Sequence, residues 1–508
     1  MKTYTLGSYI DFLKQKNLVG NIICPETLFG QTVRLVSCNS KQVEEGTLFI
    51  VKGAHFRPQY LKDAAEAGAF CYVAEKAVEG SSLPFIQVTD IRAAAAWLAQ
   101  KFYGEPWKRL TVTGITGTKG KSTTAFFING ILSAWEKKNG KPEPALISSF
   151  TTYNGVDRFE SVMTTPEPLD LEYHFYTAAE HGISYATMEV SSQALKYDRV
   201  LGVQFDVGVF LNIGYDHISP IEHPTWEDYF ASKLKIFDQS RMAVVNLDSD
   251  HAQEILSRAK EKTSKVVTFS MKDETADVFG HSLKRDGGRL SFQVRRKGRD
   301  EMFELNMLGS FNVSNALAAI AVCGEYGVST DCMREGLKNT KVPGHMDFYH
   351  SADGKLTVVV DYAHNQLSFQ KLFEAVREDF PGMRTVIVFG APGGKALDRR
   401  HDMGEIAGKY ADFVYISEDD PQEEDLAQIN EQIAQAVREQ NCPYEIIPDR
   451  REAIRRAVYD SKVPTVLLLA GRGEDPIMRR GTKFIPFPTD GDLIKEILAE
   501  YDAQNPNS

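Results

Sequence analysis

Residues 114–123 read Gly-Ile-Thr-Gly-Thr-Lys-Gly-Lys-Ser-Thr and lie between an apolar run, 110–112, and a helix-like segment, 124–135. A strand, a glycine-rich turn and the start of a helix form a cradle for phosphate, because backbone N–H groups and the helix dipole converge there on anionic oxygens. Lys121 would reach the β- and γ-phosphates of ATP, and the Ser122 hydroxyl would ligate Mg²⁺. The stretch therefore predicts an ATP-binding protein.

The spacing of this stretch keeps two alternatives open. Gly114 and Gly120 are separated by one residue more than in the usual P-loop, so a glycine turn without a ligand and a dinucleotide-binding turn are both conceivable. Neither alternative requires the Gly-Lys-Ser-Thr ending, which supplies a cation and a metal ligand. The predicted ATP-binding residues of the stretch are Gly117, Thr118, Lys119, Gly120, Lys121, Ser122 and Thr123.

Around this stretch, short apolar runs alternate with amphipathic segments. The expected strands are residues 110–112, 186–190, 207–211 and 243–246. The expected helices include residues 171–180 and 225–237, and a β-rich excursion follows at 269–303, with a turn at 286–288. Such alternation is typical of an α/β domain with a parallel sheet and helices on both faces.

Two further blocks flank the central one. A chain of 508 residues is too long for a single core, and about three domains are expected. The first block is predicted to hold strands at residues 48–51, 70–73 and 84–88. The third block alternates strands at 356–361, 385–389, 413–416 and 465–470 with helices at 369–378, 402–410 and 426–439, as in a second doubly wound α/β domain. We therefore expect domains at residues 1–106, 107–340 and 341–508.

Composition excludes several classes of protein. The net charge of −11 argues against a protein that coats nucleic acid or an anionic membrane, because such proteins carry an excess of positive charge. Six cysteines lie far apart without CxxC spacing, which favours reduced thiols in a cytosol over a disulfide frame or a zinc site. The first 13 residues are too polar for a signal peptide, and no apolar run reaches the roughly 20 residues of a membrane span. We expect a cytoplasmic protein that binds no nucleic acid and does not insert into a membrane.

Two strand ends in the central block offer ligands for a magnesium ion. Glu189 ends the apolar run 186–190 and could act beside Ser122, unless it is a half-exposed strand glutamate. Asp216 and His217 follow the run 207–211, where ligands gather in α/β proteins, although His217 is as easily a structural histidine.

Lys233 lies in the amphipathic segment 229–235. From its residue type alone it is expected to be a solvated helix lysine, because lysine is seldom buried.

Polar loops also follow the strands of the third block. Asp361 could hydrogen-bond a ribose, and His364 could contact phosphate. A glycine-rich turn at 390–395 suits a polyphosphate or is a plain surface turn. The loops 417–422 and 471–475 are acidic, so that together they would attract a cationic amine, whereas apart they are two acidic surface loops.

The motifs occur in the order found in a known family. The chain resembles the ATP-dependent Mur ligases of peptidoglycan synthesis, and among them the UDP-N-acetylmuramoyl-tripeptide synthetases, which add the third residue of the stem peptide. The markers span almost the whole chain: GITGTKGKST at 114–123, TTPEPLDL at 164–171, MEVSSQALKYDRV at 188–200, NIGYDH at 212–217, YFASK at 229–233, LGSFNVSNALAA at 308–319, VPGHMDF at 342–348, DYAHN at 361–365 and AGRGED at 470–475.

The resemblance implies a three-domain α/β fold and a reaction. The domains would be an N-terminal UDP-sugar domain, a central P-loop ATPase domain with a parallel sheet, and a C-terminal Rossmann-like domain that binds the incoming amino acid. ATP would phosphorylate a carboxylate of UDP-N-acetylmuramoyl-L-alanyl-D-glutamate, and an amine would attack the acyl phosphate. Such chemistry depends mainly on positioning and charge neutralisation. We expect a monomer.

The resemblance also implies roles for individual residues. Ser122 and Glu189 match the ligands of a first Mg²⁺, and His217 matches a ligand of a second. Lys233 matches a lysine that is carbamylated in this family, so the resemblance reverses the solvated reading and implies N6-carboxylysine as a further ligand. The implied catalytic residues are Lys121, Glu189, His217 and Lys233. Asn312 would lie near adenine, and Asp361 and His364 would close over ATP. The residues that would contact the UDP-muramoyl-peptide are Ser40, Thr164, Thr165, Ser191 and Arg199.

Departures from the family pattern bear on the added amino acid. Synthetases that add meso-diaminopimelate carry Asp-Asn-Pro-Arg, whose arginine grips the distal carboxylate; this chain has Gln422 at that position, and a neutral amide cannot form such an ion pair. A side chain that ends in an amine alone is favoured, so L-lysine is expected, then L-ornithine, with meso-diaminopimelate as the alternative. The predicted amino-acid-binding residues are Asp419, Asp420, Gln422, Glu474 and Asp475.

Two alternative functions lie outside this reaction. A folylpolyglutamate synthetase uses the same ATP chemistry, but the separate N-terminal block and the sequence SSQALKYDR argue against it. An ATP-binding module without ligation would release phosphate in the absence of an amino acid acceptor.

The predicted uridine contact at Ser40 is weakened by a further departure from the family pattern, because the family's Asp-Ser-Arg is Asn39-Ser40-Lys41 here.

Overall fold

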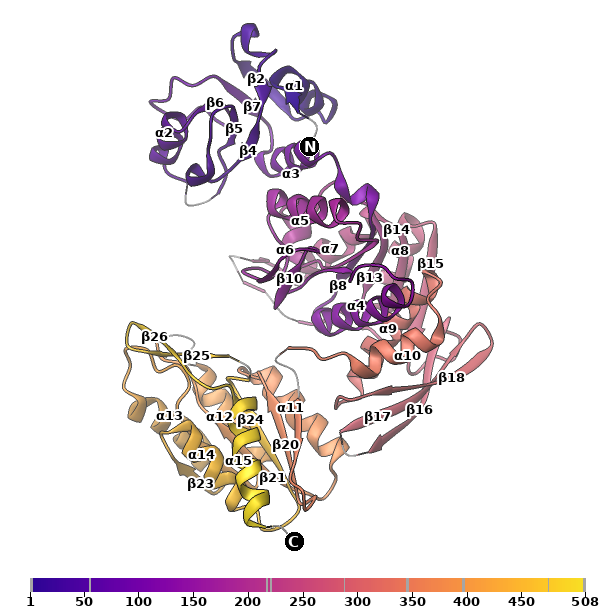
Figure 1. Cartoon of the computed structure of the whole chain (residues 1–508), viewed down its shortest axis with the longest axis vertical. Helices are drawn as coiled ribbons and strands as arrows, with labels where there is room; N and C mark the ends of the chain where they lie inside the picture. Colours follow the sequence, from indigo (N-terminus) through magenta and orange to yellow (C-terminus); the bar gives the residue numbers. More distant parts are fainter. Residues whose placement is uncertain are drawn as a thin grey trace. The chain divides into compact units, whose positions relative to one another are not determined.

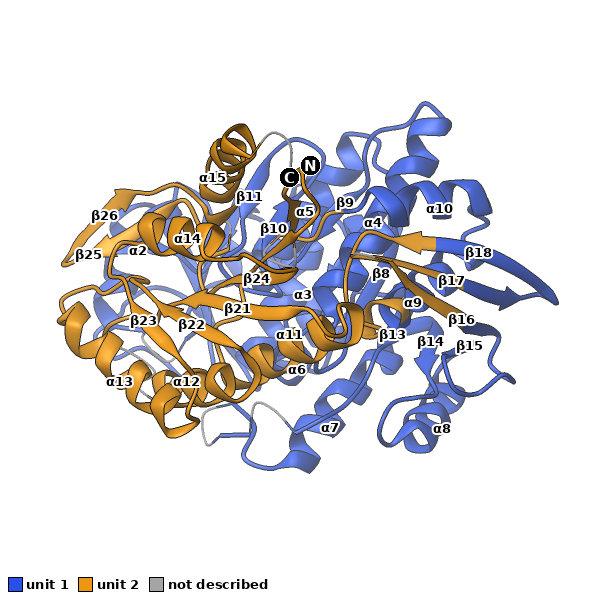
Figure 2. Ribbon diagram, turned by 90° about the horizontal axis from the view of Figure 1, so that it is seen from below, with its two compact units in different colours: residues 1–281, 293–303, 314–340 blue, residues 282–292, 304–313, 341–508 orange. Residues whose placement is uncertain are grey.

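The computed structural model describes residues 3–53, 56–215, 218–219, 222–286, 288–343, 347–394, 398–473 and 475–505. The chain divides into two compact units (Figure 2). The first comprises residues 1–281, 293–303 and 314–340, and the second comprises 282–292, 304–313 and 341–508. Part of the β-rich excursion thus clusters with the C-terminal block. The three larger sheets fall one into each expected domain, although the domain boundaries themselves remain predictions.

The N-terminal sheet has the strand order β2-β7-β6-β5-β4 (Figure 1). Four of its strands are parallel, and β2 (Val19–Ile23) pairs antiparallel at one edge; the parallel strands are β4 (Leu35–Ser37), β5 (Thr47–Ile50), β6 (Ala69–Ala74) and β7 (Phe85–Val88). One face is covered by α1 (Leu6–Gln15) and α3 (Ile91–Tyr103), and the other by α2 (Pro58–Glu66). Short strands β1 (Tyr4–Thr5) and β3 (Thr32–Val33) pair separately.

The central sheet has eleven strands in the order β11-β10-β9-β12-β8-β13-β14-β15-β16-β17-β18. Seven neighbours run parallel: β9 (Ala145–Ile147), β12 (Tyr185–Glu189), β8 (Thr111–Thr116), β13 (Phe205–Phe210), β14 (Ser240–Asn246), β15 (Lys265–Ser270) and β16 (Val278–Asp286). The edges are β10 (Thr151–Tyr153) with β11 (Arg158–Glu160), which run antiparallel, and β17 (Arg289–Arg296) with β18 (Arg299–Leu305). The expected parallel sheet is confirmed at its centre, and the strands at its two sides make the whole sheet mixed.

Helices cover both faces of this sheet. Alternate strand residues such as Met188 and Phe210 pack with α5 (Pro168–Glu180), α6 (Ser192–Lys196), α7 (Trp226–Leu234) and α8 (Ala252–Lys262). On the opposite face lies α4 (Lys121–Lys138), which contacts β8, β9 and β12 and supports α10 (Thr330–Asn339). Helix α9 (Phe311–Glu325) precedes α10 in the chain.

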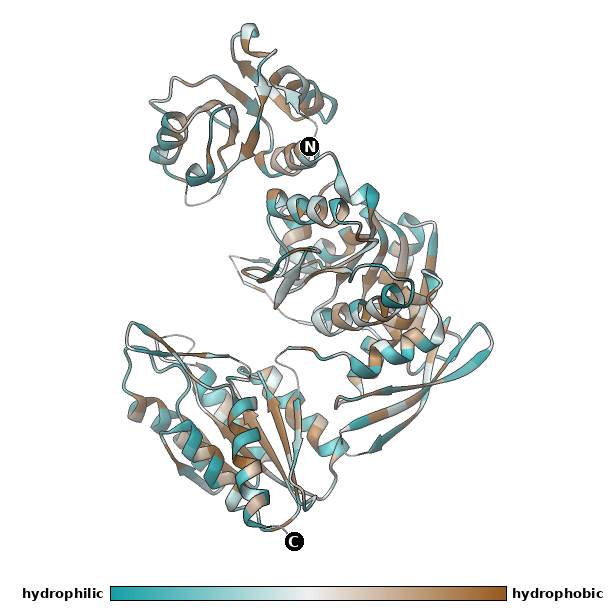
Figure 3. Cartoon of the chain, in the orientation of Figure 1, coloured by the Kyte–Doolittle hydropathy of each residue, from teal (hydrophilic) through white to brown (hydrophobic). Residues whose placement is uncertain are grey.

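The C-terminal sheet has the order β19-β20-β24-β21-β22-β23. Its strands are β19 (Asp347–His350), antiparallel at the edge, and the parallel β20 (Leu356–Asp361), β24 (Thr465–Ala470), β21 (Arg384–Phe389), β22 (Phe413–Ile416) and β23 (Tyr444–Ile446). The buried strands are strongly apolar (Figure 3). One face packs α11 (Gln366–Asp379), α12 (Asp398–Tyr410) and α13 (Leu426–Glu439), the other packs α14 (Arg450–Tyr459) and α15 (Asp490–Gln504), and a hairpin of β25 (Ile477–Arg480) and β26 (Lys483–Pro486) follows β24.

The α/β class and the expected elements of all three blocks are confirmed, with ends that differ by a few residues, among them the two elements that flank the phosphate loop. Strand β8 runs on to Thr116, and α4 begins at Lys121, so both reach into the predicted glycine-rich turn at 114–123. Gly114 belongs to the strand because the buried Phe205 ring packs on it; a Cβ there would lie 2.8 Å from that ring. Among the described residues, no helix combines the length and the apolarity needed to cross a membrane.

Gly336 of α10 packs directly on the backbone of α4. A Cβ at this position would lie 2.5 Å from the Ile131 nitrogen and 2.7 Å from the Gly130 carbonyl carbon. Backbone atoms cannot turn aside as a flexible side chain can, so Gly336→Ala should lower the free energy of unfolding by about 2 kcal/mol. Chemical denaturation measures this, with the exposed neighbour variant Glu335→Ala as the control; equal stability of the two variants would refute the close-packing account.

Candidate active site

The phosphate loop between β8 and α4 comprises residues 117–120 and is held by the neighbouring strand. Asn212, which follows β13, accepts a hydrogen bond from Lys119 N through Oδ1 (2.9 Å) and donates one to Lys119 O through Nδ2 (3.0 Å). Its main-chain oxygen accepts from Thr118 N at 3.0 Å, and the Thr118 hydroxyl accepts from Gly214 N at 3.0 Å. The loop therefore has a fixed shape.

Two ammonium groups meet at the carbonyl oxygen of Gly117. Lys121 Nζ donates to it at 2.9 Å and also to Thr118 O at 3.3 Å, and Lys233 Nζ donates to it at 2.9 Å. Lys233 is only 2% exposed, with its ammonium 4.8 Å from the Tyr229 ring centre. The expectation of a solvated lysine from residue type is thus wrong, because packing against the loop overrides it. Such a concentration of positive charge suits an anion.

Helix α4 starts directly after Gly120, whose φ of +84° lies in the left-handed region. A Cβ at this position would collide with the side-chain amide of Asn315, lying 3.2 Å from its Cγ. Glycine is therefore required at this position both by the backbone conformation and by the close packing of Asn315. The N-terminal turn of α4, with Ser122 and Thr123, follows directly, and the N–H groups of such a turn favour an anion. Sequence reasoning missed Asn315; its signal is the position three residues after Asn312, on the same helical face.

Glu189 is the last residue of β12, which pairs in parallel with β8. It therefore lies at the carboxyl end of the strands, where the phosphate loop begins. Its carboxylate is fully buried; Oε1 accepts from Ser149 N at 2.8 Å and Oε2 from the Ser149 hydroxyl at 3.1 Å. The alternative of a half-exposed strand glutamate is thus excluded. The Ser149 hydroxyl oxygen also lies 3.0 Å from that of Thr164. Sequence reasoning missed Ser149, since nothing in the sequence marks the loop after β9.

Three of the residues assigned to the muramoyl-peptide gather next to Glu189. The Thr165 hydroxyl donates to the Glu189 carbonyl at 3.0 Å and accepts from Ser191 N at 3.0 Å. Arg199 NH1 donates to the Thr165 carbonyl at 3.3 Å. With Thr164 linked through Ser149, the structure brings Thr164, Thr165, Ser191 and Arg199 together around one carboxylate.

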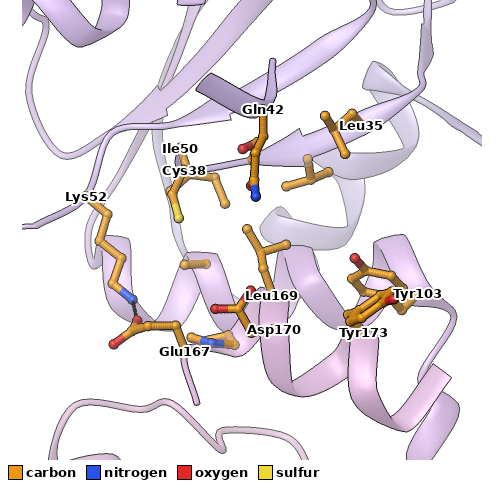
Figure 4. A pocket seen from close by; sticks show the side chains of 14 residues that line it. Leu35, Cys38, Gln42, Ile50, Lys52, Tyr103, Glu167, Leu169, Asp170 and Tyr173 are labelled. Atoms are coloured by element: carbon orange, nitrogen blue, oxygen red, sulfur yellow. Dashed lines mark hydrogen bonds and ion pairs between the residues drawn. The ribbon is translucent and has the colours of Figure 1, made fainter. Parts of the chain in front are cut away.

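A cavity of about 290 Å³ lies between the first sheet and the start of α5 (Figure 4). Lys52, after β5, forms an ion pair with Glu167 across it, and Glu167 also accepts from Arg199 Nε at 2.9 Å. Burial, followed by repulsion from Glu167, raises the pKa of Asp170 on the cavity wall. The cavity thus joins the first sheet to the residues around Glu189.

Ser40 does not line this cavity. It begins a short 3₁₀ turn (Ser40–Gln42) that is capped by Asn39, whose Oδ1 accepts from Lys41 N at 3.0 Å. The polar groups of the first sheet that do line the cavity are Ser37, Cys38 and Gln42. The role of Ser40 at uridine remains a prediction. Sequence reasoning missed Ser37 and Gln42, because neither stands at the motif position that Ser40 occupies.

Sequence reasoning also missed His223. It is fully buried, with Nε2 3.0 Å from the Ser192 hydroxyl and Nδ1 2.7 Å from Asp228 Oδ2. The hydrogen bonds from Lys196 and then His223 lower the pKa of Asp228. This network ties the start of α6, next to Ser191, to α7, which carries Lys233.

In the second unit, predicted nucleotide residues lie at the carboxyl end of β20. The buried Asp361 accepts from Ala363 N at 2.7 Å, and His364 Nδ1 lies 2.8 Å from the Tyr362 carbonyl oxygen. Asn312 Nδ2 donates to the Leu308 carbonyl at 2.7 Å, near the start of α9. Their roles in binding ATP remain predictions.

The two acidic loops of the second unit do meet, but their carboxylates are paired. Asp420 Oδ1 lies 3.2 Å from Arg472 NH1, and Asp419 lies 3.7 Å from the same group. Glu418 forms a two-bond pair with Arg480, at 2.6 and 3.1 Å. Burial of several carboxylates requires cations, and the following segment supplies them. The attraction of these loops for a cationic amine remains a prediction.

Gln422 is fixed by the hairpin that follows. Its N–H donates to Arg479 O at 3.1 Å, and its carbonyl accepts from Gly481 N at 2.6 Å. It lines a cavity of about 520 Å³ together with Arg479 and Lys483. Asp475, the described acid of the second loop, accepts from Ile477 N at 2.9 Å.

Asp216, His217 and Glu474 lie outside the described residues. Within the part of the chain that the structure describes, no three His, Cys, Asp or Glu side chains form a metal cluster. Ser122 and Glu189 are nevertheless hard oxygen donors, which is the ligand type that Mg²⁺ prefers. A cationic phosphate loop, a buried carboxylate and a ring of hydroxyls can bind a nucleoside triphosphate and orient a carboxylate acceptor.

Comparisons with known proteins agree with this geometry. Residues 115–323 match the Mur ligase middle domain, and residues 345–473 match the Mur ligase glutamate ligase domain. A UDP-N-acetylmuramyl-tripeptide synthetase of Lactobacillus acidophilus is 34% identical, covering 99% of this chain and 98% of its own. A UDP-N-acetylmuramoyl-L-alanyl-D-glutamate–L-lysine ligase of Streptococcus thermophilus is 36% identical, covering 97% of this chain and 100% of its own.

Solved structures show the same fold. A UDP-N-acetylmuramoyl-L-alanyl-D-glutamate–2,6-diaminopimelate ligase superposes with a TM-score of 0.73 over 99% of this chain and 100% of that one, at 23% identity. A folylpolyglutamate synthase of Mycobacterium tuberculosis gives 0.57 over 75% of this chain and 92% of that one, at 18% identity. The chain belongs to the Mur ligase family of ATP-dependent acid–amino-acid ligases, as one of its tripeptide synthetases with the three-domain α/β fold.

Proposed function

We propose that the chain adds a diamino acid, L-lysine, to the D-glutamate of UDP-N-acetylmuramoyl-L-alanyl-D-glutamate, with hydrolysis of ATP to ADP and phosphate. The observation that carries the proposal is the cluster at the phosphate loop. Lys121 and Lys233 converge on Gly117, and the buried Glu189 ends the neighbouring strand. A protein that only sensed ATP would have no need of the hydroxyls and Arg199 gathered beside that carboxylate.

The residues of the chain have separable tasks in this reaction. Lys121 would neutralise the phosphates, and the loop amides would orient them. Ser122 and Glu189 would hold a first Mg²⁺, which when bound offsets the charge that develops on the transferred phosphoryl group. Arg199 and Thr165 would orient the acceptor carboxylate, whose acyl phosphate is then attacked by the amine. Such positioning is the main source of rate enhancement in phosphoryl transfer.

Lys233 would act in this reaction as a carbamate. As N6-carboxylysine it would carry oxygen donors of negative charge and, with His217, help to hold a second Mg²⁺. Its burial against the phosphate loop supports this, because a carbamate needs a site shielded from bulk water. We propose that the reaction takes place in the cytoplasm, by a monomer.

The cavity between the first sheet and α5 is our candidate for the uridine end of the substrate. Ser37 and Gln42 offer hydrogen-bonding groups there. Lys52, at its rim, is a cation suited to a diphosphate.

L-lysine is proposed over meso-diaminopimelate on two grounds. The relatives include L-lysine ligases, and Gln422 replaces the arginine that the family uses for a distal carboxylate. L-ornithine is a second candidate. The paired acidic loops no longer support the choice by charge alone, so it rests on these two observations.

Gln422→Arg tests the assignment of this side chain. The added guanidinium can pair with a distal carboxylate and repels a lone ε-ammonium group, so preference should shift toward meso-diaminopimelate by about tenfold in the ratio of kcat/KM values. Steady-state assays with each amino acid measure this. Gln435→Arg, on an exposed position of the helix α13, is the control; an unchanged ratio in Gln422→Arg would show that this position does not contact the side chain.

The experiment for the function itself is ligation by the wild-type protein, followed by mass spectrometry of the product. A product heavier by one lysine residue, formed only with ATP, supports the proposal. Nucleotide hydrolysis without any amino acid acceptor would favour a non-ligating ATP-binding module, and addition of glutamate to a folate would favour a folylpolyglutamate synthetase.

A further inference from the structure

Arg472 joins the two acidic loops of the second unit through one buried side chain, which is 2% exposed. Its NH1 lies 3.2 Å from Asp420 Oδ1 and 3.7 Å from Asp419 Oδ1. Its NH2 donates to the carbonyl oxygens of Asp475 at 3.1 Å and Ile477 at 3.0 Å. A single guanidinium thus fixes both segments that carry the predicted amino-acid-binding residues.

The position of Arg472 in the sheet explains why a guanidinium is needed. Arg472 follows β24 and its acidic partners follow β22, with β21 between the two strands. The side chain therefore spans a strand and binds on both sides at once, with the Phe487 ring 5.2 Å from its guanidinium. Asp420 Oδ1 also accepts from Arg479 N at 3.0 Å, which completes a closed arrangement. A planar fork of donors can satisfy this geometry, whereas the point charge of a lysine cannot.

We infer that Arg472 is a positioning residue for the incoming amino acid, one that sets the directions of the Asp419 and Asp420 carboxylates and of the Asp475 loop without contacting the substrate. The inference rests on the proposed function, which assigns these loops to the amino acid. It goes beyond that function by separating the residue that orients the loops from the residues that bind.

The electrostatics of Asp419 supply an independent readout. Burial raises the pKa of Asp419 to about 6, against the opposing effect of the two nearby arginines. Loss of Arg472 removes one of these cations, so the pKa of Asp419 should rise further and the carboxylate should form only at higher pH. The charged and titratable groups that face Asp419 are Arg450, Arg472, Asp420, Asp490 and Tyr362.

The test compares Arg472→Lys and Arg472→Met with the wild-type enzyme in ligation assays. We expect the KM for the amino acid to rise about tenfold in Arg472→Lys and about 100-fold in Arg472→Met, with the KM for ATP unchanged. In Arg472→Met the amino-acid KM should improve as pH is raised from 6 to 8, more steeply than in the wild type. If Arg472→Met does not fold, Arg472→Lys carries the test alone.

Arg296→Lys is the matched control for loss of a partly buried arginine. Arg296 binds Glu301 (2.6 Å) and Thr330 (2.7 Å) in the first unit, so its loss should lower thermal stability without changing the amino-acid KM. An unchanged amino-acid KM in Arg472→Lys would overturn the inference, as would an equal rise in the KM values for all three substrates. Wild-type protein that ligates no diamino acid would instead refute the proposed function, and this inference with it.

Discussion

Replacement of Lys233 by alanine is expected to lower kcat/KM for ligation by about 10³-fold or more, which is the scale seen when a group that stabilises developing charge is removed. The side chain is buried and lies against the carbonyl of Gly117, the same oxygen that Lys121 contacts. A carbamate at this position would supply oxygen ligands to a metal ion, and alanine supplies none. Added formate or acetate should restore part of the activity by entering the space left behind.

Two further measurements separate this role from a structural one. Lys235→Ala, two positions away on an exposed turn, should retain wild-type activity. The melting temperature of Lys233→Ala is measured alongside, because the change also removes the contacts of the buried side chain with Gly117 O and the Tyr229 ring; a protein that stays folded at the assay temperature assigns the loss of activity to the site. Wild-type activity in Lys233→Ala would remove the carbamate proposal, and a loss that bicarbonate and small carboxylates never relieve would point to a role for the ammonium itself.

Glu189→Gln is expected to lower kcat by about 10²–10³-fold and to raise the Mg²⁺ concentration needed for half-maximal activity. The carboxylate accepts two hydrogen bonds from Ser149, at 2.8 and 3.1 Å, and is wholly buried. An amide of the same shape keeps one acceptor but faces the other Ser149 donor with its NH₂ group, and it carries no charge for the metal ion. Activity measured against Mg²⁺ concentration tests both parts of this prediction.

Glu172→Gln is the matched control for this change. Glu172 is also buried in the first unit, and burial, followed by repulsion from Glu105, raises its pKa well above the usual value. Burial thus disfavours the charged form of this carboxyl group, and glutamine should replace it with little effect on the dependence on Mg²⁺. Equal Mg²⁺ dependence in Glu189→Gln and the wild type would remove Glu189 from the metal site.

The α/β class, the order of the elements and the phosphate loop could be predicted from the sequence, because apolar runs and glycine-rich turns are local signals. The length of β8 could not be predicted, because Gly114 makes room for the ring of Phe205, which lies 91 positions later in the sequence. A glycine that permits a turn and a glycine that admits a ring look alike in sequence.

The burial and the partners of the charged residues could not be predicted from the sequence either. Lys233 is buried because α7 packs on the phosphate loop, whereas lysine as a residue type favours solvent. The carboxylates of Asp419 and Asp420 are paired with Arg472, which lies more than fifty positions later and is brought close only by the sheet order. Counting the charges within a motif therefore misses the cation that partly offsets them.

The measurement that tests the central claim most directly is phosphate release from ATP in the presence of Mg²⁺ and UDP-N-acetylmuramoyl-L-alanyl-D-glutamate, with one amino acid added at a time. Our account predicts release with L-lysine, little with L-ornithine and none without an amino acid. Release only with meso-diaminopimelate would keep the ligase but contradict the interpretation of Gln422. Release that is independent of the amino acid, or none with any, would contradict the proposed function.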